Sequence, residues 1–227
     1  MTNIFRFLLK TCLWLLVLSI LWVLTYKWIN PYATPLMWIK HLQSKSNKTI
    51  RHQWVPLAKI SKNLQLAVIC SEDQQFVAHS GFDTKAISTA IQEYQSGKRL
   101  RGASTISQQT AKNIFLWPKR SWIRKGLEIY FTLLIETLWS KERILEVYLN
   151  SIEMGDEIYG AQAASIFWFN KSAMSLTVAE ASAIAAILPN PIKYLANPPS
   201  DYIQKRKKWI RIQMRNYGTL TFEIKKE

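Results

Sequence analysis

The sequence contains little cysteine, histidine or glycine. Of its 227 residues, 2 are cysteine, 3 are histidine and 7 are glycine. Cys12 lies inside an apolar run and Cys70 lies next to Glu72, so the two cysteines do not suggest a pair and exclude the disulfide framework of a small secreted domain. The histidines are scattered and no His-Glu-x-x-His motif occurs, which argues against a zinc enzyme.

Acidic residues are also scarce. The chain has 15 Asp and Glu against 30 Lys and Arg, a formal charge of +15 and a pI near 9.9. Such a charge favours polyanionic partners: nucleic acid, anionic phospholipid or a substrate that carries pyrophosphate. Charge alone does not choose among them. The length allows a membrane segment and one domain of ordinary size, and excludes two full catalytic domains.

The N-terminal segment has no charged residue from Thr11 to Tyr26, and Lys10 and Lys27 flank this run. Because flanking lysines can extend to the membrane surface, Ile4 to Ile29 is long enough to cross a bilayer. The alternatives are a cleaved signal peptide, which lacks a cleavage site here, and a buried soluble helix, which rarely carries three tryptophans beside lysines. We therefore predict one transmembrane helix; basic residues on both sides leave its orientation open.

The pattern predicts three parts: a tail and transmembrane anchor over 1–29, a linker and lead-in over 30–56, and one folded domain over 57–227. Apolar residues recur at intervals of three and four in most of the third part, which indicates helices. Capping residues at Asp83, Ser121, Ser140 and Thr177 indicate where four of them begin. A last helix is expected over 201–217. No convincing alternating strand is found, so the soluble part is predicted to be all-α.

Two glutamates lie in dense polar motifs. Glu72 begins the stretch 72–81, Glu128 ends the stretch 124–128, and the segment 101–113 between them combines small, amide, hydroxyl and cationic side chains. Taken singly, Glu72 resembles a carboxylate at a helix end and Glu128 a solvated partner of Arg124. Together they provide two carboxylates for proton transfer or metal ligation, and cations for a phosphorylated substrate. This set is typical of glycosyl transfer.

Four motifs appear in order along the chain. They are Glu72-Asp73-x-x-Phe76-x-x-His79-x-Gly81, Gly102-x-Ser104-Thr105-Ile106-x-Gln108-Gln109-x-x-Lys112-Asn113, Arg124-Lys125-x-x-Glu128, and Lys141-x-x-Ile144-Leu145-Glu146-x-Tyr148-Leu149-Asn150. Together they resemble the peptidoglycan glycosyltransferases, and within that family the monofunctional biosynthetic branch of Gram-negative bacteria. The likeness extends through Ile158-Tyr159-Gly160 and Leu188-Pro189-Asn190-Pro191, and it covers about residues 50–217.

The resemblance implies a mostly α, lysozyme-like glycosyltransferase domain after one transmembrane helix. It also implies polymerisation of lipid II into glycan strands, by inverting transfer with release of undecaprenyl pyrophosphate. Glu72 would be the general base, and Glu128 would act on the pyrophosphate directly or through a divalent metal, Mg or Mn; no organic cofactor is expected. The residues that would bind substrate are Asp73, Phe76, Ser104, Gln108, Lys112, Asn113, Arg120, Arg124 and Lys125.

The partners that the resemblance implies are lipid II, the growing glycan strand, membrane phospholipid, and proteins of cell-wall synthesis or division, but not nucleic acid. The location would be the bacterial inner membrane, with a single pass. The resemblance thus implies that the tail within 1–29 is cytoplasmic and that the domain over 57–227 is a glycosyltransferase domain in the periplasm. The chain has no Ser-x-x-Lys and no Lys-Thr-Gly motif, so polymerisation without cross-linking is expected.

Two other functions share these features. A lytic glycosidase acting on finished peptidoglycan would also use a catalytic glutamate, but it has no pyrophosphate to neutralise, and Lys112, Arg120, Arg124 and Lys125 argue against it. A membrane-anchored scaffold whose site has decayed would not need both carboxylates.

The sequence also predicts how the site is arranged. Glu72 and Glu128 should line one elongated cleft with Lys112 and Arg120 on its wall. The loop 115–120 should expose Leu116 and Trp117 to the membrane surface.

Overall fold

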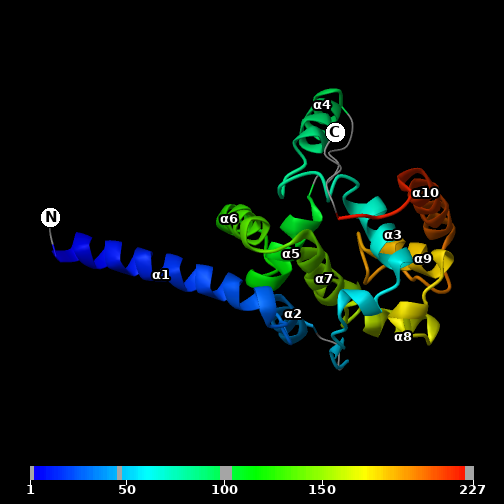
Figure 1. Ribbon diagram of the computed structural model, residues 1–227, viewed down its shortest axis with the longest axis horizontal. Helices are drawn as coiled ribbons and strands as arrows, with labels where there is room; N and C mark the ends of the chain where they lie inside the picture. Colours follow the sequence, from blue (N-terminus) through cyan, green and yellow to red (C-terminus); the bar gives the residue numbers. More distant parts are fainter. Residues whose placement is uncertain (1–2, 45–47, 98–103, 223–227) are drawn as a thin grey trace.

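A computed structural model describes residues 3–44, 48–97 and 104–222. Within these residues the fold is mostly helical (Figure 1), as the sequence predicted. The α-helices are α1 (Asn3–Trp28), α2 (Pro35–Gln43), α3 (Lys62–Glu72), α4 (Thr84–Gln95), α5 (Ile106–Phe115), α6 (Trp122–Leu138), α7 (Lys141–Ser151), α8 (Ala161–Phe169), α9 (Val178–Ile187) and α10 (Asp201–Tyr217). Short 3-10 turns lie at Leu57–Lys59 and Ala173–Ser175.

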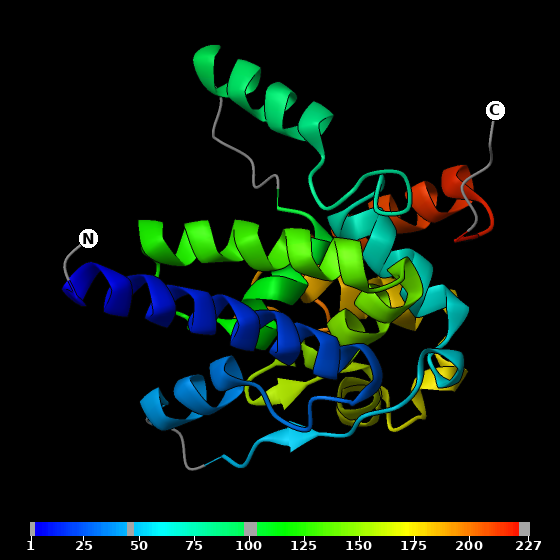
Figure 2. The ribbon, with the colours of Figure 1, turned by 60° about the vertical axis from the view of Figure 1, so that its left-hand side comes forward.

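Helix α1 projects from the domain at its N-terminal end, and its C-terminal part lies along α6 (Figure 2). Its 26 residues span about 39 Å, more than the ~30 Å of a bilayer's hydrocarbon core. By length and composition it is the one helix among the described residues that could cross a membrane. The hydroxyls of Ser19 and Tyr130 lie 2.7 Å apart, and the Trp139 indole donates to the carbonyl oxygen of Val23 at 3.0 Å. These bonds hold α6 beside the apolar helix.

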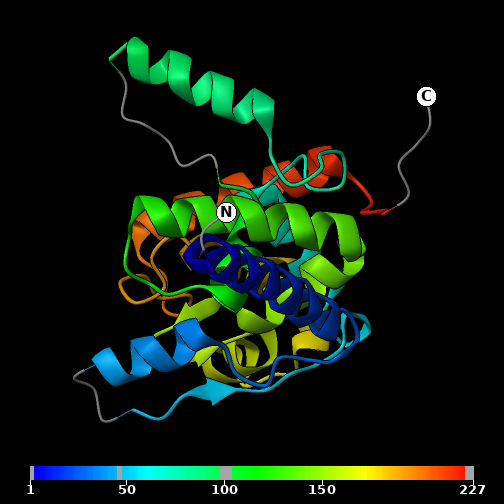
Figure 3. The same ribbon diagram turned by 90° about the vertical axis from the view of Figure 1, so that its left-hand side faces the viewer.

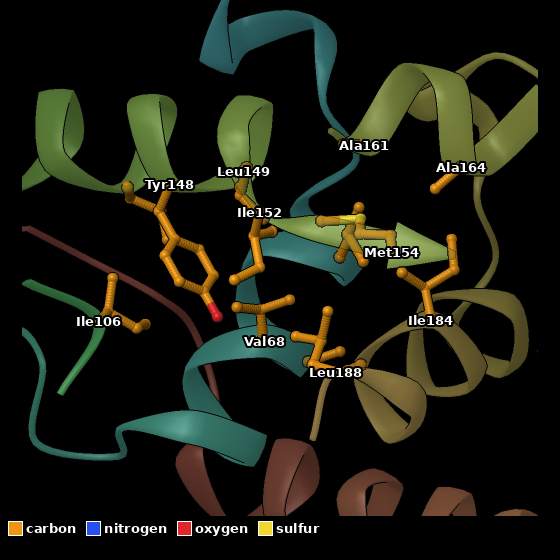
Figure 4. Packing of buried hydrophobic residues seen from close by; sticks show 14 of the residues in the cluster. Val68, Ile106, Tyr148, Leu149, Ile152, Met154, Ala161, Ala164, Ile184 and Leu188 are labelled. Carbon is orange, nitrogen blue, oxygen red and sulfur yellow. The ribbon is translucent and has the colours of Figure 1, made fainter. Parts of the chain in front are cut away.

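The core lies between α3, α5, α7, α9 and α10, whose apolar faces meet at its centre. Figure 4 shows Val68 of α3, Tyr148 and Leu149 of α7 and Ile184 of α9 converging there, and all four are fully buried. Burial of one such side chain stabilises the fold by about 1.5–3 kcal/mol. Because α3, α5 and α7 share this core, the polar groups at their ends are held in fixed relative positions.

Three short strands form a small sheet, which the sequence did not predict. Strand β1 (Arg51–His52) pairs in parallel with β3 (Ile158–Tyr159), and β2 (Glu153–Gly155) pairs antiparallel with β3. The expectation of an all-α soluble part was therefore wrong in this detail. The physical reason is length: strands of two or three residues show no period of two, and β2 is buried at every position.

Residues 30–56, predicted to be a linker and lead-in, contain α2 and β1. Leu36 and Met37 of α2 are buried, and this helix packs on α5. The segment is thus part of the folded body where the structure describes it. The domain boundaries drawn at residues 29 and 56 stay predictions.

The predicted helix starts are confirmed by hydrogen bonds. Asp83, Ser121 and Ser140 each accept a backbone N–H from the first turn of the following helix, and Thr177 forms a capping box with Glu180. Such caps are local, which is why a sequence pattern can predict them.

Helix α4 stands away from the rest of the domain (Figure 3).

Gly160, just before α8, provides a test of the fold. Its φ is +84°, and an added Cβ would lie 2.6 Å from the carbonyl oxygen of Asn150. We expect Gly160→Ala to lower the free energy of unfolding by about 3 kcal/mol, because both the backbone angle and the contact are incompatible with alanine.

The matched control is Gly126→Ala. This glycine lies within α6 and has open space around its Cα, so alanine should stabilise the helix by about 0.5–1 kcal/mol. Thermal unfolding in detergent, followed by circular dichroism, measures both variants. Equal unfolding midpoints for the two variants would contradict this account.

Candidate active site

Glu72 is the last residue of α3, and its half-buried carboxylate is held by neighbours from two helices. Its Oε2 accepts from Gln109 Nε2 at 3.1 Å, and its Oε1 accepts from the Ser71 hydroxyl at 3.2 Å. Gln109 is held in turn by the hydroxyl of Tyr148, which donates to its Oε1 at 3.2 Å. Burial raises the pKa of Glu72, more than these hydrogen bonds and the charge of Arg206 lower it. The carboxylate is therefore a stronger base than an exposed glutamate.

Asp73 and Phe76 both hold the loop after α3, and their predicted contact with substrate stays a prediction. The Asp73 carboxylate accepts from the backbone N–H of Ile106 at 2.9 Å and lies 2.9 Å from His79 Nε2. Its side chain is 1% exposed. Phe76 is fully buried, with Lys141 Nζ 4.7 Å from the centre of its ring. Phe76 therefore has no exposed surface, whereas Asp73 also lines the hollow, described below, that contains Glu72.

The first turn of α5 places several motif residues beside the two hollows described below. Gln108 closes the capping box with Thr105 and is nearly buried, while Ser104 just before the helix is exposed. Asn113 is 4% exposed, and its Nδ2 has no hydrogen-bond partner among the described residues. Asn113 lines neither of the two hollows described below. Gly102 and Ala103, the start of this motif, lie outside the described residues.

Glu128 of α6 is buried between two cations. Its Oε2 accepts from Arg124 Nη1 at 3.1 Å, and its Oε1 pairs with Lys125 Nζ. Both cations stand in the first turn of α6, where the helix dipole disfavours positive charge and where no acidic residue occurs. A placement that works against the helix is explained if these cations bind an anion.

A hollow of about 220 Å³ lies in front of this group. Its lining contains four cations and one carboxylate, together with three neutral polar residues: Ser104, Gln108, Gln109, Lys112, Arg120, Arg124, Lys125 and Glu128. Burial lowers the pKa of Lys112, and the neighbouring cations Lys40, Arg124 and Arg120 lower it further, while Glu128 opposes them. The hollow therefore has a surplus of positive charge and suits a multiply charged anion.

A second hollow, of about 160 Å³, contains Glu72 together with Asp83, Ser104 and Trp209. Ser104 lines both hollows, and Gln109 lines the first while it donates to Glu72. The structure thus brings Glu72, the expected base, and the four cations to adjacent hollows that share Ser104. The two carboxylates have separate hydrogen-bond partners and line different hollows, whereas the sequence predicted one elongated cleft.

The donor set does not fit a protein-bound divalent metal. Among the described residues no group of three histidine, cysteine, aspartate or glutamate side chains could hold an ion. Glu128 offers one carboxylate, and both its oxygens are already paired with cations. Magnesium bound by protein typically has one or two carboxylates free for it. We therefore assign no chemical step to the expected Mg or Mn ion.

The loop 115–120 differs from its predicted exposure. Leu116 is 2% exposed, and Trp117 packs against the core. The exposed apolar side chains lie just beyond this loop, at Trp122 and Ile123 in the first turn of α6, which are 92% and 75% exposed. The sequence pattern located an apolar surface near the cations but assigned it to the wrong residues.

Sequence reasoning missed the groups that hold Glu72. Gln109 and Tyr148 lie inside recognised motifs, so their positions were visible although their contacts were not. Arg206, whose side chain reaches Ser71, lies outside every motif, and no pattern in the sequence indicated this contact.

The raised pKa of Glu72 has a consequence for stability. A carboxyl group whose pKa rises on folding binds its proton more tightly in the native state, so the protein loses stability as the pH increases from the ordinary value of 4.5 through the raised one. Glu72→Gln removes this loss. We expect the variant to unfold at a higher temperature than the wild type at pH 8, and the difference to fade as the pH falls toward 4.5.

Thermal unfolding of both proteins between pH 4 and pH 8 measures this difference. The control is Glu142→Gln, at an exposed position in the first turn of α7, where the helix dipole favours a carboxylate, so this variant should lose about 0.3–1 kcal/mol of stability and gain none. If Glu72→Gln were the less stable protein at pH 8, the carboxylate would be a structural anchor instead of a strained base.

Comparison with known proteins identifies the family of this chain. The family model described as transglycosylase matches residues 39–215. Three similar proteins are named biosynthetic peptidoglycan transglycosylase. The one from Shewanella oneidensis is 52% identical over 97% of this chain and 95% of its own length. Those from Bacteroides thetaiotaomicron and Aeromonas hydrophila are 54% and 56% identical, over 85% and 76% of this chain and 79% and 73% of theirs. The chain belongs to the transglycosylase family, as its four motifs predicted.

Proposed function

We propose that this protein polymerises lipid II into the glycan strands of peptidoglycan. Its family and the names of its relatives support a peptidoglycan glycosyltransferase. The observation that carries the proposal is the pair of adjacent hollows, one with a half-buried carboxylate and the other with four cations around a single carboxylate. A sugar hydroxyl and a sugar pyrophosphate are the two groups that such a pair would hold.

In this proposal Glu72 is the general base. It removes the proton from the 4-hydroxyl of the incoming GlcNAc, whose oxygen attacks the anomeric carbon of the terminal MurNAc on the growing strand. Attack from the face opposite the leaving group inverts that carbon. Gln109 and Ser71 orient the two carboxylate oxygens, and partial burial makes the carboxylate basic enough for the transfer.

The bond that breaks joins the anomeric carbon to undecaprenyl pyrophosphate, so negative charge grows on the leaving oxygen. Lys112, Arg120, Arg124 and Lys125 line the hollow that would receive it. Preorganised cations of this kind stabilise the transition state without reorganising. Glu128 holds Arg124 and Lys125 in place, and we assign it this role, not direct chemistry.

The lipid tail of the substrate requires a site close to the membrane. Helix α1 lies along α6, and the first turn of α6 carries two of the four site cations as well as the exposed Trp122 and Ile123. Apolar side chains beside cations are typical of a segment at a membrane surface. We infer a single-pass protein of the bacterial inner membrane with this domain in the periplasm. Proteins of cell-wall synthesis or division stay predicted partners.

The direct test is Glu72→Gln, because an amide of the same shape cannot accept the hydroxyl proton. We expect polymerisation of labelled lipid II by the full-length protein in detergent to fall by about 10²–10⁴. Gel separation of the glycan products measures the rate. Wild-type turnover by the folded variant would show that Glu72 is not the base, and failure of the wild type to polymerise lipid II would reject the proposed function.

Lys112→Gln separates the transferase from a lytic glycosidase. Loss of one charge-assisted contact to pyrophosphate should lower kcat/KM for lipid II by about 10- to 100-fold. The control is Arg211→Gln, which removes a cation of α10 that does not line the hollow, and its kcat/KM should match the wild type. A glycosidase would cleave finished, neutral glycan, and Lys112→Gln would leave that cleavage unchanged.

A further inference from the structure

Arg206 of α10 reaches the residue next to Glu72. Its Nη2 donates to the carbonyl oxygen of Ser71 at 3.2 Å and to Ser71 Oγ at 3.3 Å. The Ser71 hydroxyl has one proton, with Glu72 Oε1 at 3.2 Å and the carbonyl oxygen of Ala185 at 3.3 Å as acceptors. An ionised carboxylate is the stronger acceptor. The contacts therefore form a chain from the guanidinium through Ser71 to the carboxylate.

The guanidinium of Arg206 is held firmly and is partly desolvated. It lies over the ring of Trp209, with Cζ 4.5 Å from the ring centre, and Trp209 lines the same hollow as Glu72. Its Nε is buried and has no hydrogen-bond partner among the described residues. An arginine that only solvates a helix surface would turn this donor to water. The cation–π contact and the two bonds to Ser71 fix the plane of the group instead.

The surroundings of Glu72 give Arg206 a distinct electrostatic role. The titratable groups near the carboxylate are Cys70 and Asp73 on the α3 side, Asp83 before α4, Tyr148 of α7 and Arg206 of α10. Helix α5 contributes the neutral Gln109. Asp73 opposes ionisation of Glu72, and Arg206 is the cation in this set that favours it. Burial and Asp73 both disfavour the ionised form of Glu72. Without the charge of Arg206, only the neutral donors Gln109 and Ser71 would favour that form.

We propose that Arg206 is a positioning residue for Glu72, which acts through Ser71 to orient the carboxylate and to keep it ionised. The proposal rests on the proposed function, because Glu72 has to act as a base for its orientation to matter. It extends the site to the C-terminal helix, which none of the recognised motifs includes. Arg206 itself need not touch the substrate.

The other cations of α10 provide a control. Lys208, Arg211 and Arg215 line a separate hollow with Val178 and Ile212, away from Glu72. If α10 influenced Glu72 only through its overall charge, replacing one of these residues would change the pH dependence of kcat/KM as much as replacing Arg206. If the contacts through Ser71 are required, replacing Arg206 or Ser71 should shift that pH dependence in the same way, and replacing Arg211 should leave it unchanged.

The experiment compares the pH dependence of kcat/KM for lipid II in five full-length proteins: the wild type, Arg206→Gln, Ser71→Ala, Arg206→Lys and Arg211→Gln. The acidic limb of this profile reports the pKa of the general base in the free enzyme. Removing the cation or the serine donor should raise the pKa of Glu72, so the limb should move to higher pH for Arg206→Gln and Ser71→Ala. On the acidic side we expect about a tenfold loss of kcat/KM for each.

Arg206→Lys retains the charge but not the planar fork, so it should recover part of the loss, and Arg211→Gln should follow the wild-type profile. Thermal unfolding identifies any variant that fails to fold. If Arg206→Gln does not fold, Ser71→Ala still tests the chain, because it leaves the arginine in place.

An acidic limb at the wild-type pH in Ser71→Ala, or in a folded Arg206→Gln, would overturn the proposal. So would an equal shift in Arg211→Gln. Glu72→Gln separates this failure from failure of the proposed function. If Glu72→Gln is inactive while the other profiles coincide, Glu72 is the base and only the role of Arg206 is wrong.

Discussion

The hydrogen bond from the backbone N–H of Ile106 to the carboxylate of Asp73 fixes the geometry of the whole site. It joins the end of α3, which carries Glu72, to the start of α5, which carries Gln109 and Lys112. His79 holds the same carboxylate from the loop, so a buried charge satisfies one orphan donor of α5 and orders the turn after α3. Breaking such a buried contact typically costs about 1–3 kcal/mol, and here it would also separate the base from the cations.

This coupling explains why residues of one motif have different roles. Glu72 and Asp73 line the same hollow, but the Asp73 carboxylate is bonded to Ile106 and His79. Phe76 is fully buried, so Asp73 and Phe76 hold the loop that places Glu72. On α6, Glu128 is buried and orients two cations, and those cations line the hollow of about 220 Å³. In both motifs, buried side chains keep in position the charged groups that line a hollow.

The sequence predicted the parts of this arrangement that depend on local interactions. Helix starts at Asp83 and Ser121 follow from one side chain and the next turn, so the pattern was sufficient. A strand of two residues is too short to show an alternation of apolar and polar side chains. The burial of Phe76 depends on packing against other helices, which a local pattern does not contain. Arg206 contacts Ser71 across 135 residues, and no local pattern can report such a contact. A prediction from motifs therefore finds the reacting groups more readily than the residues that hold them.

The site also shows why a fold keeps features that lower its own stability. Arg124 and Lys125 oppose the dipole of α6, and burial opposes ionisation of Glu72. Repulsion among neighbouring cations further disfavours the charged form of Lys112. In the empty protein these effects are unfavourable. A bound pyrophosphate would neutralise the cations, and a hydroxyl proton transferred to Glu72 would discharge the buried carboxylate. In the proposed reaction, the electrostatic strain would therefore be largest before the transfer and would be relieved as the transfer proceeds, which is how a preorganised site favours a transition state over the free enzyme.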